Sequence, residues 1–457
     1  MNGAGDAALE LAERAWQTAD GDAADALVQV ERSGLARFAA SQVHQPTLIE
    51  NESVVLRVVR DGRVGTAATN RTDARGLRAV ARRAEIAADS APRDPGFPGL
   101  AGPLTPRSTE GFDAETAELS PEGLASLTLA AIGPDAGLRM YGYLTSAATE
   151  IAVASSTGLA VHQAMTDASV LVLAANGHRS GYAAGCSWRV GELDPAGVAA
   201  AAAGLAIRTG GAVEIPPARY RAVLCPAAFA DLLQYFAWTS ISGRALLEGR
   251  SYLTGRIGER AFHPSLTLVD DGSSPEGLPR AFDFEGVPKQ PVVIVEHGVV
   301  RDVVWDRRSA AAAGDGQSST GHALPAPGQG FGPVAMNLAV HPGDVATDEL
   351  PALVGDGILV TRLHYLSVVD EREGIITGMT RDGTFRIRDG EVAEPLVNLR
   401  FTTSFPALLR DLLGISRETE RVSTADFYGD RVATASVVPS VATASFEIVG
   451  TGSGPGL

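Results

Sequence analysis

The N-terminal part of the chain shows a helical hydrophobic pattern followed by strand-like ones. Apolar residues recur at helical spacing over 7–18 with acidic residues between them, which predicts an amphipathic helix. Alternating or β-branched runs then predict an antiparallel meander with strands over 26–31, 34–41, 53–59 and 64–68. A helix predicted over 73–90 has one apolar face and several arginines, which suits packing on that sheet. The first third of the chain is therefore predicted to be α+β.

The middle of the chain contains an irregular stretch and a predicted domain boundary. Residues 92–122 are rich in proline and glycine and have no sustained period, so we expect a long surface connection there. The regular elements predicted after it are strands over 151–155, 158–163 and 169–174 and an alanine-rich helix over 195–208. Glycine and proline are concentrated again in the stretch TGGAVEIPPARY, residues 209–220. This composition places the boundary near Ala212.

The C-terminal part is predicted to be mostly β with one long helix. That helix covers 227–242, and its apolar spacing is typical of a buried element. Turn signals such as Arg381-Asp382-Gly383 separate several of the strands predicted over 266–270, 292–296, 299–304, 357–363, 384–388 and 442–449. The expected fold class is therefore α+β in two domains: an antiparallel sheet with flanking helices over 1–211, and a β-rich domain with one long helix over 212–457.

Composition narrows the classes of partner and compartment. The 457 residues carry a formal net charge of -16, which argues against a broad nucleic-acid-binding surface. No run of about 18 apolar residues is present, and the N-terminus lacks the basic flank and apolar core of a signal peptide. The two cysteines, Cys186 and Cys225, are too few and too far apart for a disulfide framework. We expect a cytoplasmic protein that binds neither nucleic acid nor membrane.

A glycine-framed loop, GQSSTGHALP, offers the most concentrated polar chemistry. Its hydroxyls, amides and imidazole suit the binding of an extended peptide or of a partner's backbone, and they belong to Gln317, Ser318, Ser319, Thr320 and His322. The simpler alternative is a histidine hydrogen-bonded within its own turn. Arg381 is a second candidate for a cavity wall, against the alternative of a solvated hairpin arginine. A serine hydrolase is disfavoured because the serines stand in no Gly-x-Ser-x-Gly elbow.

Several landmarks resemble, in order and spacing, the family of TldD and PmbA proteins, the latter also called TldE. The landmarks span nearly the whole chain: IENESVVLRVVRDGRVGTAATN from Ile49, LLQYFAWTSISGRALLEGRSYLTGRIGERAF from Leu232, AFDFEGVP from Ala281, SSTGHA from Ser318, the long segment GILVTRLHYLSVVDEREGIITGMTRDGTFRIRDGEV from Gly357, NLRF from Asn398 and VVPS near Val437. The resemblance implies an α+β N-terminal domain and a β-rich C-terminal domain. It also implies two related subunits that form a heterodimer around an enclosed cavity.

The resemblance further implies that this chain lacks the metal site of its relatives. In that family the TldD-type subunit binds zinc through a His-Glu-x-x-x-His helix and a cysteine near the C-terminus. The matching positions here hold Gln234, Tyr235, Trp238 and Thr239, and none of these can rebuild the site. No histidine of the chain precedes a glutamate, and no cysteine follows residue 421. The chain therefore resembles the PmbA or TldE type, without metal or catalytic residues of its own.

The retained helix is expected to be structural. Within it, Leu232, Leu233, Phe236 and Ala237 are expected to face the core. For Trp238 we favour filling of the core over lining of a cavity, because buried aromatic residues usually pack.

The leading functional hypothesis is a noncatalytic subunit that completes the cavity of a zinc peptidase. By resemblance, such pairs process small peptides or degrade unfolded ones, and we expect the peptide to bind by strand addition. Zinc is expected in a TldD-type partner, and a homodimer is an option for the chain alone. The alternatives are an autonomous hydrolase with a non-zinc mechanism and a binding or regulatory protein.

Overall fold

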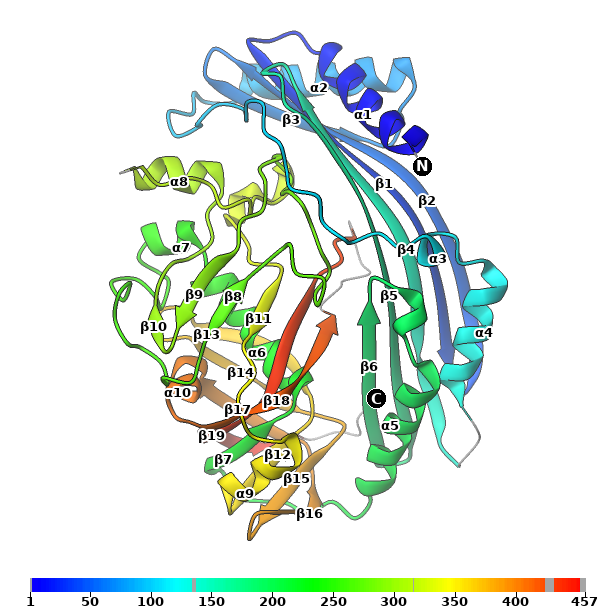
Figure 1. The fold of residues 1–457 in the computed structure, drawn as a ribbon, viewed down its shortest axis with the longest axis vertical. Helices are drawn as coiled ribbons and strands as arrows, with labels where there is room; N and C mark the ends of the chain where they lie inside the picture. Colours follow the sequence, from blue (N-terminus) through cyan, green and yellow to red (C-terminus); the bar gives the residue numbers. More distant parts are fainter. Residues whose placement is uncertain (1, 134–136, 315, 424–430, 453–457) are drawn as a thin grey trace.

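The computed structural model describes residues 2–133, 137–314, 316–423 and 431–452. Its strands form two sheets that lie side by side in Figure 1, with the second sheet and its helices on the concave side of the first. The first sheet has six strands in the order β3-β2-β1-β4-β5-β6, and the second has thirteen. The predicted α+β class is confirmed, as are the antiparallel N-terminal sheet and the strand-rich C-terminal part.

The N-terminal sheet is antiparallel throughout. Its strands are β1 (Ala23–Ala39), β2 (Gln42–Arg60), β3 (Arg63–Thr69), β4 (Arg139–Ser155), β5 (Ala160–Asn176) and β6 (Arg179–Ser187). The helices associated with it are α1 (Asn2–Gln17), α2 (Ala74–Ser90), α3 (Ala114–Ala117), α4 (Pro121–Ile132) and α5 (Pro195–Arg208). The large helices cover its convex face (Figure 1).

Alternation along β1 shows why this sheet is covered on both faces. Ala26 and Val28 pack with α1 and α2, whereas Leu27, between them, packs with Phe282 and Phe284 from the C-terminal half. Successive side chains of a strand point to opposite faces, so one apolar run contributes to two cores. The sheet is therefore the layer that joins the helices to the rest of the molecule.

The first sheet differs from its prediction in strand length and in one helix. β1 runs without a break through Arg32 and Ser33, where two strands were predicted. At Gly34 a Cβ would lie 2.9 Å from the Leu124 side chain, so the glycine marks close packing of α4 rather than a turn. β2 begins at Gln42, eleven residues before its predicted start, and α4 occupies the end of the expected irregular stretch and continues beyond it.

The second sheet is built around the long strand β19 (Ala435–Thr451), which pairs with β7, β11, β17 and β18. The other strands are β7 (Ala218–Leu224), β8 (Leu268–Asp270), β9 (Val292–Glu296), β10 (Val299–Val300), β11 (Leu338–Val340), β12 (Gly357–Val360), β13 (Leu363–Asp370), β14 (Ile375–Thr380), β15 (Thr384–Arg388), β16 (Glu391–Leu396), β17 (Leu399–Ser404) and β18 (Leu412–Ser423). Short helices connect them: α7 (Gly243–Leu247), α8 (Arg307–Ala313), α9 (Leu350–Val354), α10 (Phe405–Arg410) and the 3₁₀ turns Ala326–Phe331 and Thr347–Glu349; a third 3₁₀ turn, Val190–Glu192, precedes α5.

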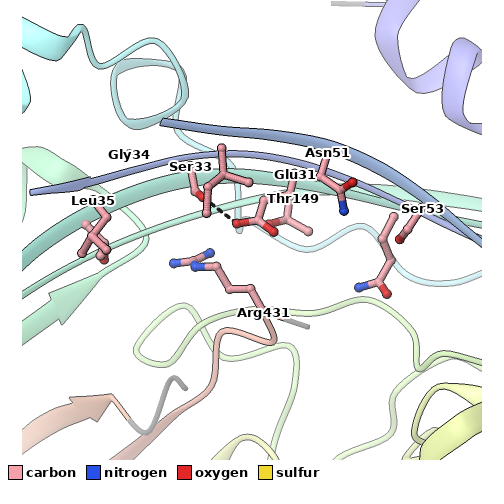
Figure 2. Close-up of a pocket in the computed structure, with 11 residues that line it drawn as sticks. Glu31, Ser33, Gly34, Leu35, Asn51, Ser53, Thr149 and Arg431 are labelled. Atoms are coloured by element: carbon pink, nitrogen blue, oxygen red, sulfur yellow. Dashed lines mark hydrogen bonds between the residues drawn. The ribbon is translucent and has the colours of Figure 1, made fainter. Parts of the chain in front are cut away.

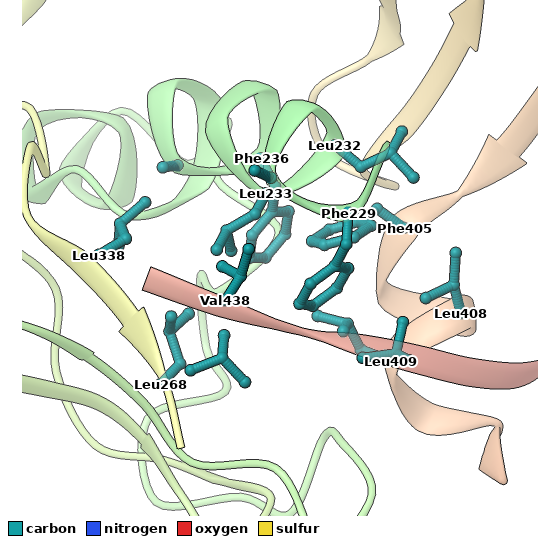
Figure 3. Packing of buried hydrophobic residues seen from close by; sticks show 14 of the residues in the cluster. Phe229, Leu232, Leu233, Phe236, Leu268, Leu338, Phe405, Leu408, Leu409 and Val438 are labelled. Carbon is teal, nitrogen blue, oxygen red and sulfur yellow. The ribbon is translucent and has the colours of Figure 1, made fainter. Parts of the chain in front are cut away.

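Helix α6 (Pro226–Ser240) lies in the main core of the C-terminal half. Phe229, Leu232, Leu233 and Phe236 pack against Phe405, Leu408, Leu409 and Val438 (Figure 3). The Phe236 and Phe405 ring centroids are 5.5 Å apart, and the Phe236 and Phe262 rings meet edge to face at 89°. Each such buried side chain contributes about 1.5–3 kcal/mol. The prediction that Leu232, Leu233, Phe236 and Ala237 face the core is confirmed.

Two tight turns between neighbouring strands have the backbone angles of a hairpin. Asp61 and Gly62 between β2 and β3 both have positive φ, at 52° and 72°, and so do His297 and Gly298 between β9 and β10, at 48° and 79°. Two successive positive φ values are required by the type I′ hairpin, whose twist matches that of the strands.

The helices in the described part of the chain are all too short or too polar to cross a membrane.

Candidate functional site

One side of α6 lines a cavity of about 650 Å³ instead of the core. Gln234 and Trp238 stand one helical turn apart on this side, and Thr239 follows them. The opposite wall comes from the segment that includes Phe331, Val334 and Met336 and from the start of β19. The cavity thus lies on the helix face where the family resemblance places a metal motif.

The four motif positions have different environments. Trp238 is 46% exposed, so the expectation that it fills the core is wrong: its position on α6 points away from the face that carries Phe229 and Phe236. Tyr235 is half-buried beside it, with ring centroids 5.2 Å apart. The Thr239 hydroxyl donates to the backbone carbonyl of Tyr235 at 3.1 Å. The Gln234 amide makes no hydrogen bond with any residue that the structure describes.

Charged groups at this cavity neutralise one another. Arg250 donates to Glu248 at 2.7 Å and to Glu371 at 3.1 Å. Arg244 donates to Glu248 at 2.7 Å and also bonds the carbonyl of Gly330. Hydrogen bonds from Arg250 and Arg244 hold the pKa of Glu248 below its usual value, so this carboxylate stays ionised between the two guanidinium groups. Two cations and two anions leave the wall without local net charge.

The residues present do not fit a zinc ion. A zinc site needs three or four histidine, cysteine or carboxylate ligands that converge on one point. No such group of three is found among residues 2–133, 137–314, 316–423 and 431–452. Glu371 is the one carboxylate among the described residues that line the cavity, and it is held by Arg250. An amide, a hydroxyl and an indole at the motif positions supply no substitute.

A second, smaller cavity of about 220 Å³ lies on the concave face of the N-terminal sheet. Figure 2 shows Glu31, Ser33, Asn51 and Thr149 around it, with Arg431 extending toward the sheet from the C-terminal half. Arg431 donates to Asp167 at 2.8 Å, and the side chains of this pair are nearly buried. The polar strand residues that line this smaller cavity form no recognisable motif in the sequence, because alternating polar side chains also occur on solvent-exposed strands.

The sequence matches two parts of one protein family. The family profile described as the PmbA/TldA metallopeptidase C-terminal domain matches residues 217–450, just over half of the chain. The profile described as PmbA/TldA metallopeptidase domain 1 matches residues 24–88. The chain belongs to the PmbA/TldD family.

Individual relatives agree with this assignment over shorter stretches. A metalloprotease of Methanothermobacter thermautotrophicus is 29% identical over 173 residues, which cover 38% of this chain and 37% of that protein. A metalloprotease TldD homolog of Haemophilus influenzae is 28% identical over 152 residues, 32% of this chain and 30% of that protein. The chain therefore aligns with only about a third of the length of these two relatives.

A solved structure extends the likeness of the fold to nearly the full length. TldE from Thermococcus kodakarensis superposes with a TM-score of 0.85 at 21% sequence identity, covering 96% of this chain and 99% of that one. At this identity the likeness concerns the fold.

The polar loop of this PmbA/TldD family member is tied down rather than open. His322 is 1% exposed, its Nε2 lies 2.8 Å from Asp270 Oδ1, and its Nδ1 lies 2.9 Å from Thr320 Oγ1. The Ser319 hydroxyl donates to the carbonyl of Trp305, and Thr320 is buried against the same residue. His322 and Thr320 are thus structural, contrary to the expectation of peptide contacts. The alternative of a histidine hydrogen-bonded within its own turn is confirmed by the bond between His322 and Thr320, but it did not include the bond between His322 and Asp270.

The other two members of that loop lie outside the α6 cavity. Gln317 is half-buried, and its side-chain amide donates to the neighbouring Ser318 carbonyl at 3.3 Å. Ser318 is exposed. Neither belongs to the cavity wall formed by α6.

The cluster around His322 contains residue types that hydrolases use, but they are buried away from solvent. Lys289 Nζ lies 3.5 Å from Asp270 Oδ1, and both side chains are almost fully buried. Burial, reinforced by the Lys289 charge, lowers the pKa of His322 and keeps its imidazole neutral. Although burial opposes ionisation, Lys289 and His322 lower the pKa of Asp270. Thr320, His322 and Asp270 form a hydroxyl–imidazole–carboxylate chain, but all three are buried and the two ring nitrogens have exchanged the partners that they have in a catalytic triad, which weakens the alternative of an autonomous hydrolase.

Arg381 is neither a cavity residue nor a solvated one. Only 15% of its side chain is exposed, and its Nε lies 3.9 Å from Asp382. Asp382 is held more closely by Arg362, at 2.7 Å, and the Arg362 guanidinium lies 3.9 Å above the Tyr182 ring of the first sheet. The prediction of a solvated hairpin arginine is therefore wrong, because the region around this turn lies against the first sheet.

Sequence reasoning missed Asp231, the carboxylate of α6. Burial raises its pKa to about 7, against the opposing effects of Arg362 and of a hydrogen bond from the Leu363 backbone. A carboxyl with a near-neutral pKa is a common general base, but Asp231 does not line the cavity. The available signal was the one charged residue of this helix, at a position next to the predicted core residues.

Proposed function

We propose that this chain is a noncatalytic, TldE-type subunit of a heterodimeric zinc peptidase that processes small or unfolded peptides. One observation carries the proposal: α6 keeps a well-packed core face and a cavity face, while Gln234, Tyr235 and Thr239 replace the ligands and base that the family motif requires. The zinc and the hydrolytic step then belong to a TldD-type partner. The pair is proposed to act in the cytoplasm.

The physical separation of the two helix faces explains how such a subunit arises. Core packing depends on Phe229, Leu232, Leu233 and Phe236, which are independent of any metal. Trp238 on the cavity face is 46% exposed and lies outside that core cluster, so substitutions there are compatible with an intact fold. Loss of zinc ligands is therefore tolerated when a related subunit keeps them.

A free strand edge supports a partner subunit. β2 pairs with β1 along nearly its whole length, but β3 reaches only residues 54–60. Within the described chain, the outer edge of residues 42–53 thus has no strand beside it. Leu48 is 69% exposed on this segment, and Val43 and Ile49 are also exposed. An unpaired edge with apolar side chains is a common site for pairing with another chain.

Mixing with a TldD-type relative that carries His-Glu-x-x-x-His tests the proposal. Light scattering is expected to show a complex with the mass of one copy of each chain. Leu48→Lys is expected to weaken this complex at least tenfold, because it places a charge in the proposed contact. Ile86→Lys, at an exposed position of α2, is the matched control and should have no effect. A mixture that contains only separate chains at micromolar concentration would contradict the proposed pairing.

A further inference from the structure

We infer that the cavity beside α6 binds one apolar side chain, aromatic or branched aliphatic, of an extended peptide, and that the Gln234 amide hydrogen-bonds the adjoining peptide backbone. The inference rests on the proposed function, since it takes peptides as the substrate class. It adds a specificity site on the subunit that lacks the metal.

The wall of the cavity is suited to an apolar group. Trp238 is 46% exposed and Phe331 is 76% exposed, and both face the cavity. Val334, Met336 and Val432, each half-buried, add aliphatic and thioether surface. A ligand that removes exposed aromatic rings from water lowers the free energy of the system, so these rings favour binding. Methionine adapts its shape to different apolar partners, which suits a site that accepts several side chains.

The size of the cavity fits one side chain with its neighbouring backbone. Its volume of about 650 Å³ lies in the range of small-ligand pockets, roughly 300–1,000 Å³. A partner subunit, in contrast, needs a broad surface of about 800 Å² on each side. The cavity is therefore assigned to a peptide side chain, and the free edge of β2 to the partner.

The charges around the cavity exclude an acidic side chain as its ligand. Arg244 and Arg250 are both engaged by carboxylates, as described above, so neither of these two guanidinium groups is free to bind a ligand carboxylate. The chain as a whole carries a formal net charge of -16, which repels acidic peptides at long range. Neutral or basic peptides with an apolar residue are the expected ligands.

Gln234 supplies the polar contact that such a pocket needs. Its side-chain amide has no hydrogen-bond partner among the described residues, and it lies one turn before Trp238 on the same helix face. An amide offers both donors and an acceptor, so it can pair with a peptide N–H and C=O at once. We therefore expect Gln234 to contact the peptide backbone and Trp238 to contact the apolar side chain, so that each contact can be removed separately.

The test uses the full chain and ten-residue unstructured peptides that differ only at a central residue, Phe, Ser or Asp. Titration calorimetry is expected to give a dissociation constant at least tenfold lower for the Phe peptide than for the Ser peptide, from burial of the ring. The Asp peptide should bind most weakly. Binding of the Phe peptide should also shift the tryptophan emission, and Trp238→Phe should abolish most of that shift.

Two variants separate the two contacts. Trp238→Ala should reduce the preference for Phe over Ser severalfold, whereas Gln234→Ala should weaken both peptides by a similar factor and keep the preference. Tyr365→Ala, which removes an exposed aromatic ring outside the cavity, is the matched control and should change neither constant.

Equal affinities for the Phe and Ser peptides, or an unchanged preference in Trp238→Ala, would overturn the inference. An emission shift caused by the TldD-type partner and not by peptide would assign the cavity to the partner instead. The peptide preference is measured on this chain alone, so it stands or falls separately from subunit pairing. If pairing fails while the preference remains, the proposed heterodimer is wrong and the binding site is not.

Discussion

The cavity face of α6 and the buried cluster around His322 belong to the same half of the molecule but meet opposite requirements of a hydrolase. The α6 face is open to a cavity of about 650 Å³, yet it presents an amide, an indole and a hydroxyl. The His322 cluster joins a threonine, an imidazole, a carboxylate and a lysine within hydrogen-bonding or ion-pairing distance, but its histidine is 1% exposed. The accessible surface and the potentially reactive side chains thus lie in different places.

The difference shows that residue type alone is a poor guide to a site. Titratable groups without access stabilise the fold, because buried charges are tolerated when they are paired and hydrogen-bonded. The accessible α6 face presents neither a histidine nor a carboxylate of its own, so we propose that it binds without catalysing. The predictions below change one member of each region in turn.

The largest effect is expected from Asp270→Ala. This substitution leaves the buried Lys289 ammonium and the Asn337 backbone N–H without their carboxylate. Breaking a buried ion pair from one side costs about 3–5 kcal/mol. Urea denaturation should show that loss in the free energy of unfolding. Asp348→Ala, at an exposed position, is the matched control and should stay within about 0.5 kcal/mol of the parent; a loss equally small for Asp270→Ala would show the cluster to be dispensable.

Asp231→Asn is expected to change how stability depends on pH. The carboxyl has a pKa of about 7 in the folded chain and 3.8 as its unperturbed value, so the folded state retains a proton that the unfolded state releases. The contribution of Asp231 to stability therefore falls as pH rises from about 4 to 7. Relative to the parent, the variant should gain ~1–2 kcal/mol between pH 4.5 and pH 8, which is less than the full pKa shift implies because the side chain is partly exposed to solvent. Parallel pH profiles would mean that Asp231 titrates normally.

The double variant Gln234→His with Tyr235→Glu should alter stability more than activity. It adds one imidazole and one carboxylate to α6, but Thr239 and the C-terminal ligand position stay unable to bind zinc. We expect no metal-dependent cleavage of an unstructured peptide and a loss of about 1 kcal/mol, because the contact between Tyr235 and Trp238 disappears. Zinc-stimulated cleavage by this variant would show the site to be nearly intact.

The smallest effect is expected from metal removal. Dialysis of the isolated chain against a chelator should leave its melting temperature unchanged within about 1 °C, because we expect no bound metal to remove. A metal that binds only the folded state raises the melting temperature, so its removal would lower that temperature. Elemental analysis should find no stoichiometric zinc. One zinc per chain that survives dialysis would reveal a site that the described residues do not show.

The parts of the fold that local chemistry determines were predictable. Asp61-Gly62 and His297-Gly298 gave the hairpin turns, since few other residue pairs accept two positive φ values. The start of β2 was missed because residues 42–52 are mostly exposed and show no alternation. The break predicted within β1 was wrong because Gly34 serves the packing of α4, a contact between segments far apart in the chain.

The candidate site was predictable in its frame and not in its details. The position of α6 followed from apolar spacing and from family resemblance. The exposure of Trp238 depended on which side of the helix the core occupies, and large aromatic residues bias that expectation toward burial. The pairing of His322 with Asp270 joins residues 52 positions apart, so no local pattern reveals it.

Cleavage of an unstructured peptide tests the central claim most directly, with this chain alone, the TldD-type relative alone and the two mixed in equal amounts. We predict no cleavage by this chain and a rate for the mixture at least tenfold above that of the relative alone, removed by a zinc chelator. Substantial cleavage by this chain alone, or a relative whose full rate does not change when this chain is added, would contradict the account.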